Sequence, residues 1–512
     1  MSRPERLGLL RGALMVCGTA SDVGKSHVVI GLCRSLARRG IRVAPFKAQN
    51  MALNSFVTAD GHEIGRAQAA QAMAAGIPAE AVMNPILLKP TGERTSQVMV
   101  MGEPIGHLDA AEYHALKPAL LGTVVDALAE LRHRFDVVIC EGAGSPAEIN
   151  LLDHDIVNLR VAHAAQIPAI VVGDIDRGGV FAALFGTVAL LPDDLRSHVQ
   201  GFVINKFRGD PALLFDGLFE LERRSGVPTL GVIPWLRDVA LDAEDSLSLD
   251  ARRPEPSAPA VADTLDVAVV RLPRISNFTD LDALAIEPGV SVRWITDPAG
   301  LGEPDLVIIP GTKATVADLE WMRGRGLDRA IAAVSHKRGG PLVLGICGGY
   351  QMMGRTIDDP VESGRGIVAG LDWLPMTTTF ETVKVTRQRR GRALQRAVTG
   401  YEIHHGRISR SAELEGWVDL DDVVGAEREG AGDPAAGPYV GTTLHGIMEA
   451  DGFRAAFLGE VACRRGKAWV AAGVSFGAAR EAQMDRLADA IEAHVDIAAI
   501  DRLISSAKLE HP

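Results

Sequence analysis

Residues 341–354 read PLVLGICGGYQMMG, and they indicate how the rest of the chain is organised. An apolar run ends at Gly345-Ile346-Cys347-Gly348-Gly349, and a segment compatible with a helix follows. This pattern is typical of a nucleophile elbow, a tight strand-to-helix turn in which glycines permit a strained backbone. The helix dipole favours a thiolate at such a turn, as nucleophilic catalysis requires. The pattern predicts Cys347 as a nucleophile; for a lone cysteine the alternative is a buried residue in a glycine-rich turn.

The length and composition indicate a soluble α/β protein of several domains. The chain has 512 residues, of which 47% are hydrophobic, 23% charged and 5% aromatic. Its net charge of −12 argues against a nucleic-acid partner. The N-terminus lacks a signal peptide, and no apolar run is long enough to span a bilayer. We therefore expect a cytoplasmic protein without a membrane partner. The scattered cysteines, without a CxxC pair, argue against disulfides and a zinc site.

Residues 18–26 read GTASDVGKS and predict a phosphate-binding loop. A short apolar run at 12–17 precedes this loop, and a segment with helical periodicity follows at 27–39. Backbone N–H groups of such a loop wrap phosphate oxygens, the lysine meets the terminal phosphates and the serine holds Mg²⁺. Five residues, not four, separate the two glycines, and this spacing resembles dethiobiotin synthetase and its relatives. The candidate ATP-binding residues are Gly18, Thr19, Asp22, Val23, Gly24, Lys25 and Ser26.

Three polar residues elsewhere in the first 235 residues are candidates for the same site. Glu141 ends an apolar run at the tip of a predicted strand, where packing explains an acid poorly, so we expect it to bind Mg²⁺. Glu63 lies in the first turn of a predicted helix, where it either compensates the helix dipole or contacts metal. Asn205 belongs to an Asn-Lys-x-x-x-Asp motif that resembles base-recognition loops of P-loop proteins.

Two polar loops are candidates for substrate binding. Residues 47–55, KAQNMALNS, follow the second predicted strand and open onto the site at its carboxyl end. In residues 173–179, Arg177 is either a cation for a polyanionic substrate or a solvated loop charge. The substrate candidates are Lys47, Gln49, Asn50, Asn54, Asp174 and Arg177. At least five strand–helix repeats imply one doubly wound domain over residues 1–250.

A second α/β domain is expected at 265–465, after a linker rich in Pro, Ala and charge at 251–264. Residues 466–512 are expected to form a helical tail. A Pro-Gly-Thr turn at 310–312 ends a strand in this second domain. Together with the elbow it suggests an oxyanion hole of backbone N–H groups, with Gly311, Thr312 and Gly348 as candidates.

Three histidines compete as the base for Cys347. His404 and His405 alternate within a strand-like run, so that one packs or contacts ligand. His445 ends an apolar strand and follows the nucleophile in chain order, as a triad histidine does. We therefore predict His445 as the base.

These motifs together resemble the cobyric acid synthases, glutamine-dependent amidases of corrinoid assembly, from Gly18 to about Arg464. The loop at 47–55 favours this family over cobyrinic acid a,c-diamide synthase, its sister. Further matching stretches are EGAGSPAE at 141–148, GDIDRGG at 173–179, GYEIH at 400–404 and LHG at 444–446.

The resemblance implies a dethiobiotin-synthetase-like P-loop domain fused to a class I glutamine amidotransferase domain. It implies ATP- and Mg²⁺-dependent amidation of four corrinoid carboxylates, with glutamine as ammonia donor, Cys347 as nucleophile and His445 as acid and base. Glu63 and Glu141 fall where dethiobiotin synthetase has metal-binding acids. One position departs from the pattern, because Ile447 stands where amidotransferases usually place the triad glutamate. Another acceptor then orients His445, or the site is a dyad. The alternatives are another glutamine-dependent synthetase and a ParA-like ATPase with a binding-only second domain.

Overall fold

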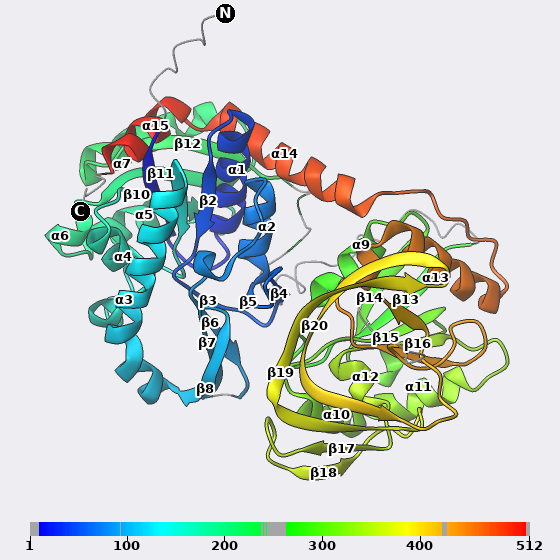
Figure 1. Ribbon diagram of the computed structural model, residues 1–512. Coiled ribbons are helices and arrows are strands. Elements are labelled where there is room, and N and C mark those ends of the chain that lie inside the picture. Colours follow the sequence, from blue (N-terminus) through cyan, green and yellow to red (C-terminus); the bar gives the residue numbers. More distant parts are fainter. Residues whose placement is uncertain are drawn as a thin grey trace, which may run out of the picture.

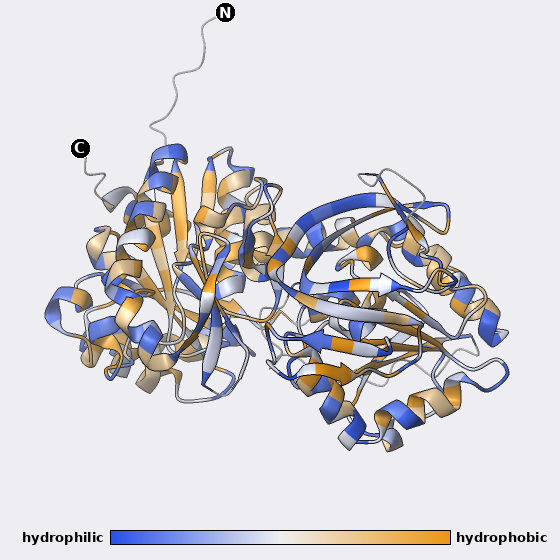
Figure 2. Ribbon diagram, turned by 60° about the horizontal axis from the view of Figure 1, so that its bottom comes forward, coloured by the Kyte–Doolittle hydropathy of each residue, from blue (hydrophilic) through white to orange (hydrophobic). Residues whose placement is uncertain are grey.

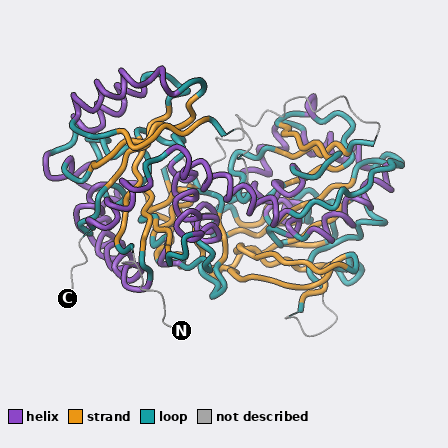
Figure 3. The backbone as a smooth tube through the Cα atoms, turned by 90° about the horizontal axis from the view of Figure 1, so that it is seen from above, coloured by secondary structure: helices purple, strands orange, loops and turns teal. Residues whose placement is uncertain are grey.

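The structure is a computed structural model that describes residues 10–92, 94–236, 239, 242, 263–421 and 428–507. The chain forms two α/β halves, each with strands flanked by helices (Figures 1 and 3). Figure 2 shows hydrophobic strands inside each half and hydrophilic segments on the outer helices. In the part of the chain that the structure describes, no helix combines the length and apolarity needed to cross a membrane.

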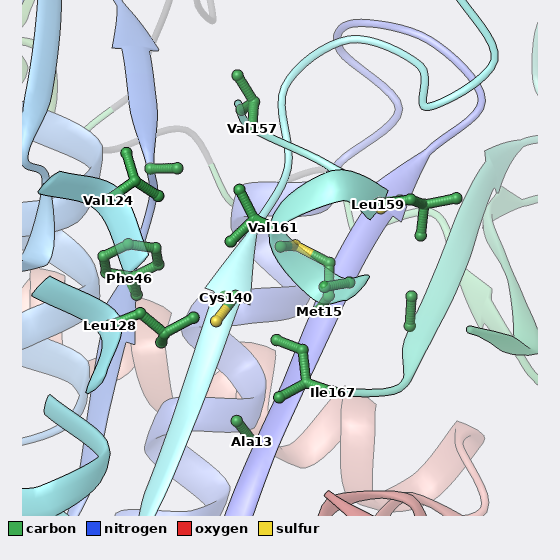
Figure 4. Close-up of a cluster of buried hydrophobic side chains, with 14 of the residues drawn as sticks. Ala13, Met15, Phe46, Val124, Leu128, Cys140, Val157, Leu159, Val161 and Ile167 are labelled. Carbon is green, nitrogen blue, oxygen red and sulfur yellow. The ribbon is translucent and has the colours of Figure 1, made fainter. Parts of the chain in front are cut away.

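The N-terminal half is built on a six-stranded parallel sheet, as the repeats predicted. Its order is β12-β11-β10-β1-β9-β2, and β1 (Gly12–Gly18) is buried throughout. Parallel strands covered on both faces require such continuous apolar runs. On one face Met15 and Cys140 pack near Leu128 of α3 (Figure 4). The other strands are β2 (Val43–Phe46), β9 (Val137–Glu141), β10 (Ala169–Asp174), β11 (Val199–Phe207) and β12 (Thr229–Pro234).

Helices cover both faces of this sheet, so the doubly wound α/β fold is confirmed. They are α1 (Lys25–Arg38), α2 (Arg66–Ala74), α3 (Ala110–Arg134), α4 (Leu159–Ala164), α5 (Val180–Ala189), α6 (Asp193–Arg196) and α7 (Phe215–Ser225). Single turns of 3-10 helix are η1 (Ala81–Met83), η2 (Leu152–His154) and η3 (Pro211–Leu214).

Two small sheets are inserted between β2 and α3, where the sequence indicated only a polar loop and a helix. One is β4 (Ser55–Val57) paired with β5 (Glu63–Gly65). The other has the order β3-β6-β7-β8, from β3 (Gln49–Met51), β6 (Ile86–Pro90), β7 (Thr95–Val100) and β8 (Glu103–Asp109). These strands carry polar residues on short runs, so their periodicity is weak.

The C-terminal half is built on a five-stranded parallel sheet of order β14-β13-β15-β16-β22. Its strands are β13 (Leu265–Val270), β14 (Val290–Ile295), β15 (Leu306–Ile309), β16 (Leu342–Ile346) and β22 (Tyr439–Thr442). The helices of this half are η4 (Phe278–Leu281), α9 (Asp282–Ala285), η5 (Pro298–Gly300), α10 (Thr315–Gly324), α11 (Leu327–Ser335), α12 (Gly348–Met352), η6 (Ile447–Glu449) and α13 (Asp451–Arg465).

A second sheet in this half contains a long hairpin, β19 (Met376–Ala393) with β20 (Arg396–Arg410), which lies on the side facing the N-terminal half (Figure 1). The remaining strands of this sheet are β17 (Thr356–Asp359), β18 (Gly366–Ala369) and β21 (Val418–Leu420).

The last two helices, α14 (Phe476–His494) and α15 (Ile497–Ser506), return to the N-terminal half (Figure 1). Asp485 of α14 accepts from Arg34 of α1 at 2.7 Å, and a Cβ at Gly31 would lie 2.6 Å from Ile491. We therefore propose that these helices complete the N-terminal domain instead of forming the separate tail expected at 466–512. Residues 251–262 of the expected linker lie outside the described residues.

Candidate active site

Cys347 lies in a strained turn between β16 and α12. Its φ of 48° and ψ of −108° are unusual for a residue with a side chain. The flanking glycines are required by space, because a Cβ at Gly349 would lie 2.0 Å from the Ile309 carbonyl oxygen. A Cβ at Gly345 would lie 2.6 Å from the Tyr350 Cα atom. The turn therefore has the geometry of a nucleophile elbow at the carboxyl end of the sheet.

His445 follows β22 and is 1% exposed. Its Nδ1 atom lies 2.7 Å from Oδ2 of Asp280, and Oδ1 of Asp280 accepts from the Gly446 N–H at 2.8 Å. Burial opposes the charged imidazole, but Asp280 and Cys347 together raise the pKa of His445 to about 10. His445 is therefore held as an imidazolium beside Cys347.

Asp280 is the acceptor for His445 that sequence reasoning did not find. It lies in η4, a single helical turn after β13, far from His445 in the chain. Ile447, at the position where amidotransferases usually place a glutamate, is buried in the hydrophobic core. Glu449, two residues further on, is bonded to Arg66 and Arg480 instead. A short polar stretch after a strand was the one available signal in the sequence, and it is not specific.

The two competing histidines have other contacts. His404 Nδ1 lies 2.8 Å from the Gly406 carbonyl oxygen, and His405 Nδ1 lies 2.9 Å from the Glu381 carbonyl oxygen. Burial lowers the pKa of His405 to about 4, so this ring is neutral near pH 7. His404 Nε2 also lies 3.6 Å from Oε1 of Glu402, so the link to Cys347 is what distinguishes His445.

The three oxyanion-hole candidates lie around the elbow and His445. A Cβ at Gly348 would lie 3.1 Å from the Thr312 backbone nitrogen, and a Cβ at Gly311 would lie 2.7 Å from Cε1 of His445. The Thr312 side chain is fixed, because its hydroxyl donates to Asp318 at 2.5 Å. The turn after β15 thus packs directly against the turn that carries the cysteine.

Two adjoining cavities meet this site. The smaller, about 30 Å³, is lined by Cys347 and Gln351 and also by Lys89 of the N-terminal domain. Its volume is about the share of one water molecule in the liquid. The larger, about 610 Å³, lies along β19 and β20 and shares Lys384 and His404 with the smaller.

Three buried nitrogens at this site are unsatisfied. Nε2 of Gln351, of His404 and of His445 form no hydrogen bond with any residue that the structure describes. Buried polar atoms are rarely left without a partner, so Gln351 and His404 indicate a polar ligand, whereas the side chain beside His445 is Cys347.

The phosphate-binding loop brings Lys25, Ser26 and Glu141 together. The Ser26 hydroxyl donates to Oε1 of Glu141 at 2.9 Å, and Nζ of Lys47 donates to the same oxygen at 2.9 Å. Lys25 Nζ donates to the Ala20 carbonyl at 2.8 Å, and Gln71 donates to the other Glu141 oxygen. The described residues hold no cluster of three or more His, Cys, Asp or Glu side chains that would enclose a metal. One carboxylate and one hydroxyl still suit Mg²⁺, which keeps waters and phosphate oxygens as its other ligands.

Other candidates support the loop itself. Thr19 donates its N–H to the Val172 carbonyl at 2.9 Å, and Asn205 donates its side-chain amide to the Val23 carbonyl at 2.9 Å. Asn205 also requires glycine at position 24, where a Cβ would lie 2.2 Å from its amide nitrogen. The Asn205 amide is thus bonded to the phosphate-binding loop, whereas the sequence pattern suggested a contact with the base.

The charged candidates beside the loop bind one another. Arg177 donates to the Asp22 carboxylate at 3.0 Å, and Lys206 donates to Asp174 at 2.9 Å. Arg177 and Asp22 are exposed, so this pair lies at the surface rim of the site.

Glu63 has different partners from Ser26 and Glu141. Its buried carboxylate is bonded to Lys89 on one side and to Lys384 of β19 on the other. Both lysines hold the pKa of Glu63 well below its usual range, although burial opposes this effect. Glu63 therefore takes part in an ion cluster between the domains.

The candidates of the 47–55 loop have different surroundings. Gln49 accepts from the Tyr113 hydroxyl, and Asn50 donates to Gln68 at 2.9 Å. Asn54 instead faces the C-terminal domain, where its side-chain oxygen accepts from the Phe278 N–H at 3.2 Å. One end of the loop thus lies at Glu141 and the other at the domain interface.

A cysteine elbow with a histidine–carboxylate pair in one domain, and a phosphate-binding loop in the other, define a glutamine amidotransferase joined to a nucleotide-binding domain. Comparison with known proteins agrees with this class. Residues 266–453 match the CobB/CobQ-like glutamine amidotransferase domain, and residues 14–249 match the CobQ/CobB/MinD/ParA nucleotide binding domain.

Full-length relatives specify the family. The chain is 52% identical to the cobyric acid synthase of Nocardia farcinica, with 97% of each chain covered. It is 53% identical to that of Rhodococcus jostii, covering 97% of this chain and 96% of the relative. It is 50% identical to that of Frankia casuarinae, with 97% of each covered. The chain belongs to the cobyric acid synthase family.

Proposed function

We propose that this protein uses ATP and glutamine to amidate the b, d, e and g carboxylates of adenosylcobyrinic acid a,c-diamide, giving adenosylcobyric acid in the cytoplasm. One observation carries the proposal: a Cys347–His445–Asp280 constellation and a phosphate-binding loop occur in one chain. The cobyric acid synthases that match over nearly the full length support this substrate.

In the C-terminal domain, the Cys347 thiolate attacks the carboxamide carbon of glutamine. We expect the backbone N–H groups of Gly311, Thr312 and Gly348, which lie around the elbow, to stabilise the resulting oxyanion. The His445 imidazolium donates its proton to the departing ammonia, and the neutral ring then accepts a proton from the water that hydrolyses the thioester. Glutamate leaves and Cys347 is regenerated as the thiolate. Asp280 stabilises the imidazolium and fixes the ring orientation throughout.

Glutamine itself is too large for the cavity of about 30 Å³ at Cys347. The adjoining cavity of about 610 Å³ has room for the amino-acid end, and its lining carries both signs of charge, as a zwitterion requires. We therefore place the carboxamide beside Cys347 and Gln351 and the amino and carboxylate groups in the larger cavity.

In the N-terminal domain, Lys25 and the loop N–H groups bind the ATP phosphates. Ser26 and Glu141 are the residues that would hold Mg²⁺, which when bound neutralises phosphate charge. A substrate carboxylate attacks the γ-phosphorus and releases ADP, giving an acyl phosphate. Ammonia then attacks the acyl carbon, phosphate leaves, and a proton is lost to give the amide.

Ammonia reacts only in its unprotonated form, so a passage that excludes water is needed between the two sites. The small cavity at Cys347 is suited to begin this passage, because Lys89 of the N-terminal domain forms part of its wall.

The two alternatives have less support. A ParA-like switch with a binding-only second domain leaves the buried Cys347–His445–Asp280 arrangement unexplained. A cobyrinic acid a,c-diamide synthase would use the same chemistry on two carboxylates, and the full-length relatives carry another name.

Mass spectrometry of the corrinoid after incubation with glutamine, Mg-ATP and enzyme tests the proposal. Each conversion of a carboxylate into an amide lowers the mass by about one dalton, so we expect a decrease of about four. Lys25→Ala should greatly slow the decrease, and Cys347→Ser should abolish it unless free ammonia replaces glutamine. Glutaminase activity without any change in corrinoid mass would show that the corrinoid is not the substrate, while the protein would still be a glutamine amidotransferase.

A further inference from the structure

Two residues of the N-terminal domain hold the segment that carries Asp280. The Ser55 N–H donates to Oδ1 of Asn277 at 2.8 Å, and the Phe278 N–H donates to Oδ1 of Asn54 at 3.2 Å. Asn54 and Ser55 are buried, with exposures of 1% and 0%. Because η4 begins at Phe278, these bonds fix the turn on which Asp280 lies.

The same segment also supports the ring of His445. The Ser55 carbonyl oxygen accepts from the Tyr401 hydroxyl at 3.0 Å. The Tyr401 ring stacks on His445 at a centroid distance of 5.4 Å, and the two residues exchange backbone hydrogen bonds of 2.9 and 3.0 Å. The N-terminal domain therefore contacts both the carboxylate that orients His445, through η4, and the ring that packs on it.

The other end of the same loop lies in the candidate nucleotide site. Lys47 donates to Oε1 of Glu141, the oxygen that also accepts from Ser26. A divalent cation bound by Ser26 and Glu141 would compete with the Lys47 ammonium for this oxygen, because both are cations. Seven residues after Lys47 the chain reaches Asn54, so displacement of the lysine is transmitted along a short segment.

A second connection runs in parallel through α2. Its first residue, Arg66, donates to Glu449 at 2.7 Å, and Glu449 lies four residues after His445. Gln71, in the same short helix, donates to the second oxygen of Glu141. The backbone N–H of Arg66 also donates to the Asn54 carbonyl at 3.1 Å, which joins the two connections.

We propose that the 47–55 segment couples the two active sites, so that ligand in the nucleotide site sets the position of Asp280 and His445. Asn54, Ser55 and Asn277 are positioning residues in this device, and Lys47 is its sensor. The inference rests on the proposed function, since it assumes that Cys347 and His445 release ammonia for use in the other domain. Full glutaminase activity then requires Mg-ATP and the corrinoid to be bound.

The test uses two substitutions at Asn277, whose φ of 53° lies in the left-handed region. Asn277→Gly removes the acceptor for Ser55 and tolerates this backbone conformation, whereas Asn277→Asp retains an acceptor. Gln388→Ala is the matched control, because Gln388 donates to the Val57 carbonyl at 2.9 Å between the same two domains, whereas the Asn277 bond holds the start of η4.

Two quantities are measured with and without Mg-ATP and the corrinoid: glutamate release, and the rate at which iodoacetamide alkylates Cys347. Peptide mapping is needed for the second, because Cys463 is exposed. We expect ligand to change both quantities on the order of tenfold in the wild-type protein and in Gln388→Ala, a typical coupling between sites. Asn277→Gly should lose the effect and Asn277→Asp should retain it, while amidation with free ammonia stays unchanged in both.

A ligand effect in Asn277→Gly equal to that of the wild-type protein would overturn the inference, as would its absence from the wild-type protein. An equal loss in Gln388→Ala would show that domain docking in general is responsible, and would also overturn it. If Asn277→Gly does not fold, Asn54→Ala tests the neighbouring bond from the other domain. Wild-type protein that fails to amidate the corrinoid with free ammonia would instead refute the proposed function.

Discussion

The Asp280 carboxylate lies 2.7 Å from Nδ1 of His445, although 165 residues separate the two in the chain. The geometry is that of the third member of a catalytic triad, in which a carboxylate fixes the tautomer of the histidine and stabilises its charged form. Asp280 thus supplies the carboxylate that Ile447, at the usual position of the glutamate, does not have. We propose that Cys347, His445 and Asp280, which come from three distant segments of one domain, form a catalytic triad.

Asp280→Asn should lower glutaminase activity by roughly a factor of a thousand or more, because an amide does not stabilise the imidazolium and favours the wrong tautomer. Amidation supplied with free ammonia should be unchanged, since the N-terminal domain is intact. Glutamate release and corrinoid mass measure the two activities. Asp297→Asn is a suitable control, because Asp297 follows the neighbouring strand β14 and caps η5. Retention of full glutaminase activity in Asp280→Asn would contradict the triad.

The unfolding of the protein should depend on pH through His445. Its folded pKa of about 10 lies above its ordinary value of 6.5, so its contribution to the free energy of unfolding is complete below pH 6.5. That contribution is lost as the pH rises through about 10. In Asp280→Asn the folded pKa falls, so stability should decrease less between these two values. Urea unfolding across this pH range compares the two proteins, and identical curves would show that Asp280 does not raise this pKa.

The elbow was predictable because its cause is local. The backbone at Cys347 has a φ of 48°, and neighbouring atoms leave no room for a Cβ at Gly345 or Gly349. The turn therefore requires glycines within a few residues of the cysteine. Asp280 was not predictable, because β15 and β16 separate β13 from β22 in the sheet, and only the loop after β13 brings η4 to the residue after β22. A single acidic residue in a polar stretch carries no mark of such a long-range contact.

The docking of the two domains was likewise invisible in the sequence. Glu63 and Asn54 have the composition of site residues, and sequence reasoning assigned them to metal and substrate. In the structure Glu63 is bonded to Lys384, and Asn54 to the backbone of Phe278, both from the other domain. Polar residues at a buried domain interface and in an active site follow the same rule, that buried polar atoms need partners, so the sequence does not distinguish them.

Lys25→Ala should reduce ATP-dependent amidation by on the order of a hundredfold or more with either glutamine or free ammonia, because one phosphate-binding charge is lost. Basal glutamate release without ATP should stay unchanged, since Lys25 donates to the Ala20 and Gly144 carbonyls within the N-terminal domain. Corrinoid mass and glutamate are measured in the same samples. Amidation that survives in Lys25→Ala would argue against the phosphate-binding role of the loop.

Glu141→Gln should raise the Mg²⁺ concentration needed for half-maximal amidation, because an amide is a weaker ligand for a hard cation than a carboxylate. Ser26→Ala should act in the same direction. Both shifts are read from amidation rates across a Mg²⁺ titration at fixed ATP. Glu141→Gln should also lower the free energy of unfolding, because Lys47 loses its buried partner. A decrease in stability with an unchanged Mg²⁺ requirement would remove Glu141 from the metal site.

Glu63→Gln separates a metal ligand from an interface residue. The Glu63 carboxylate is fully buried between Lys89 and Lys384, so removing its charge leaves two lysines without their common partner. We expect a loss of about 3–5 kcal/mol in the free energy of unfolding, the usual cost of breaking a buried ion pair. If Glu63→Gln folds, its Mg²⁺ requirement should equal that of the wild-type protein.

The same substitution should change the charge of Lys384. Glu63 keeps the pKa of Lys384 at about 8 against the effect of burial, so Glu63→Gln should lower this pKa and leave Lys384 partly neutral near pH 7. Glu63→Asp keeps the charge and should recover part of the stability, whereas a shifted Mg²⁺ titration in both variants would restore Glu63 as a metal ligand.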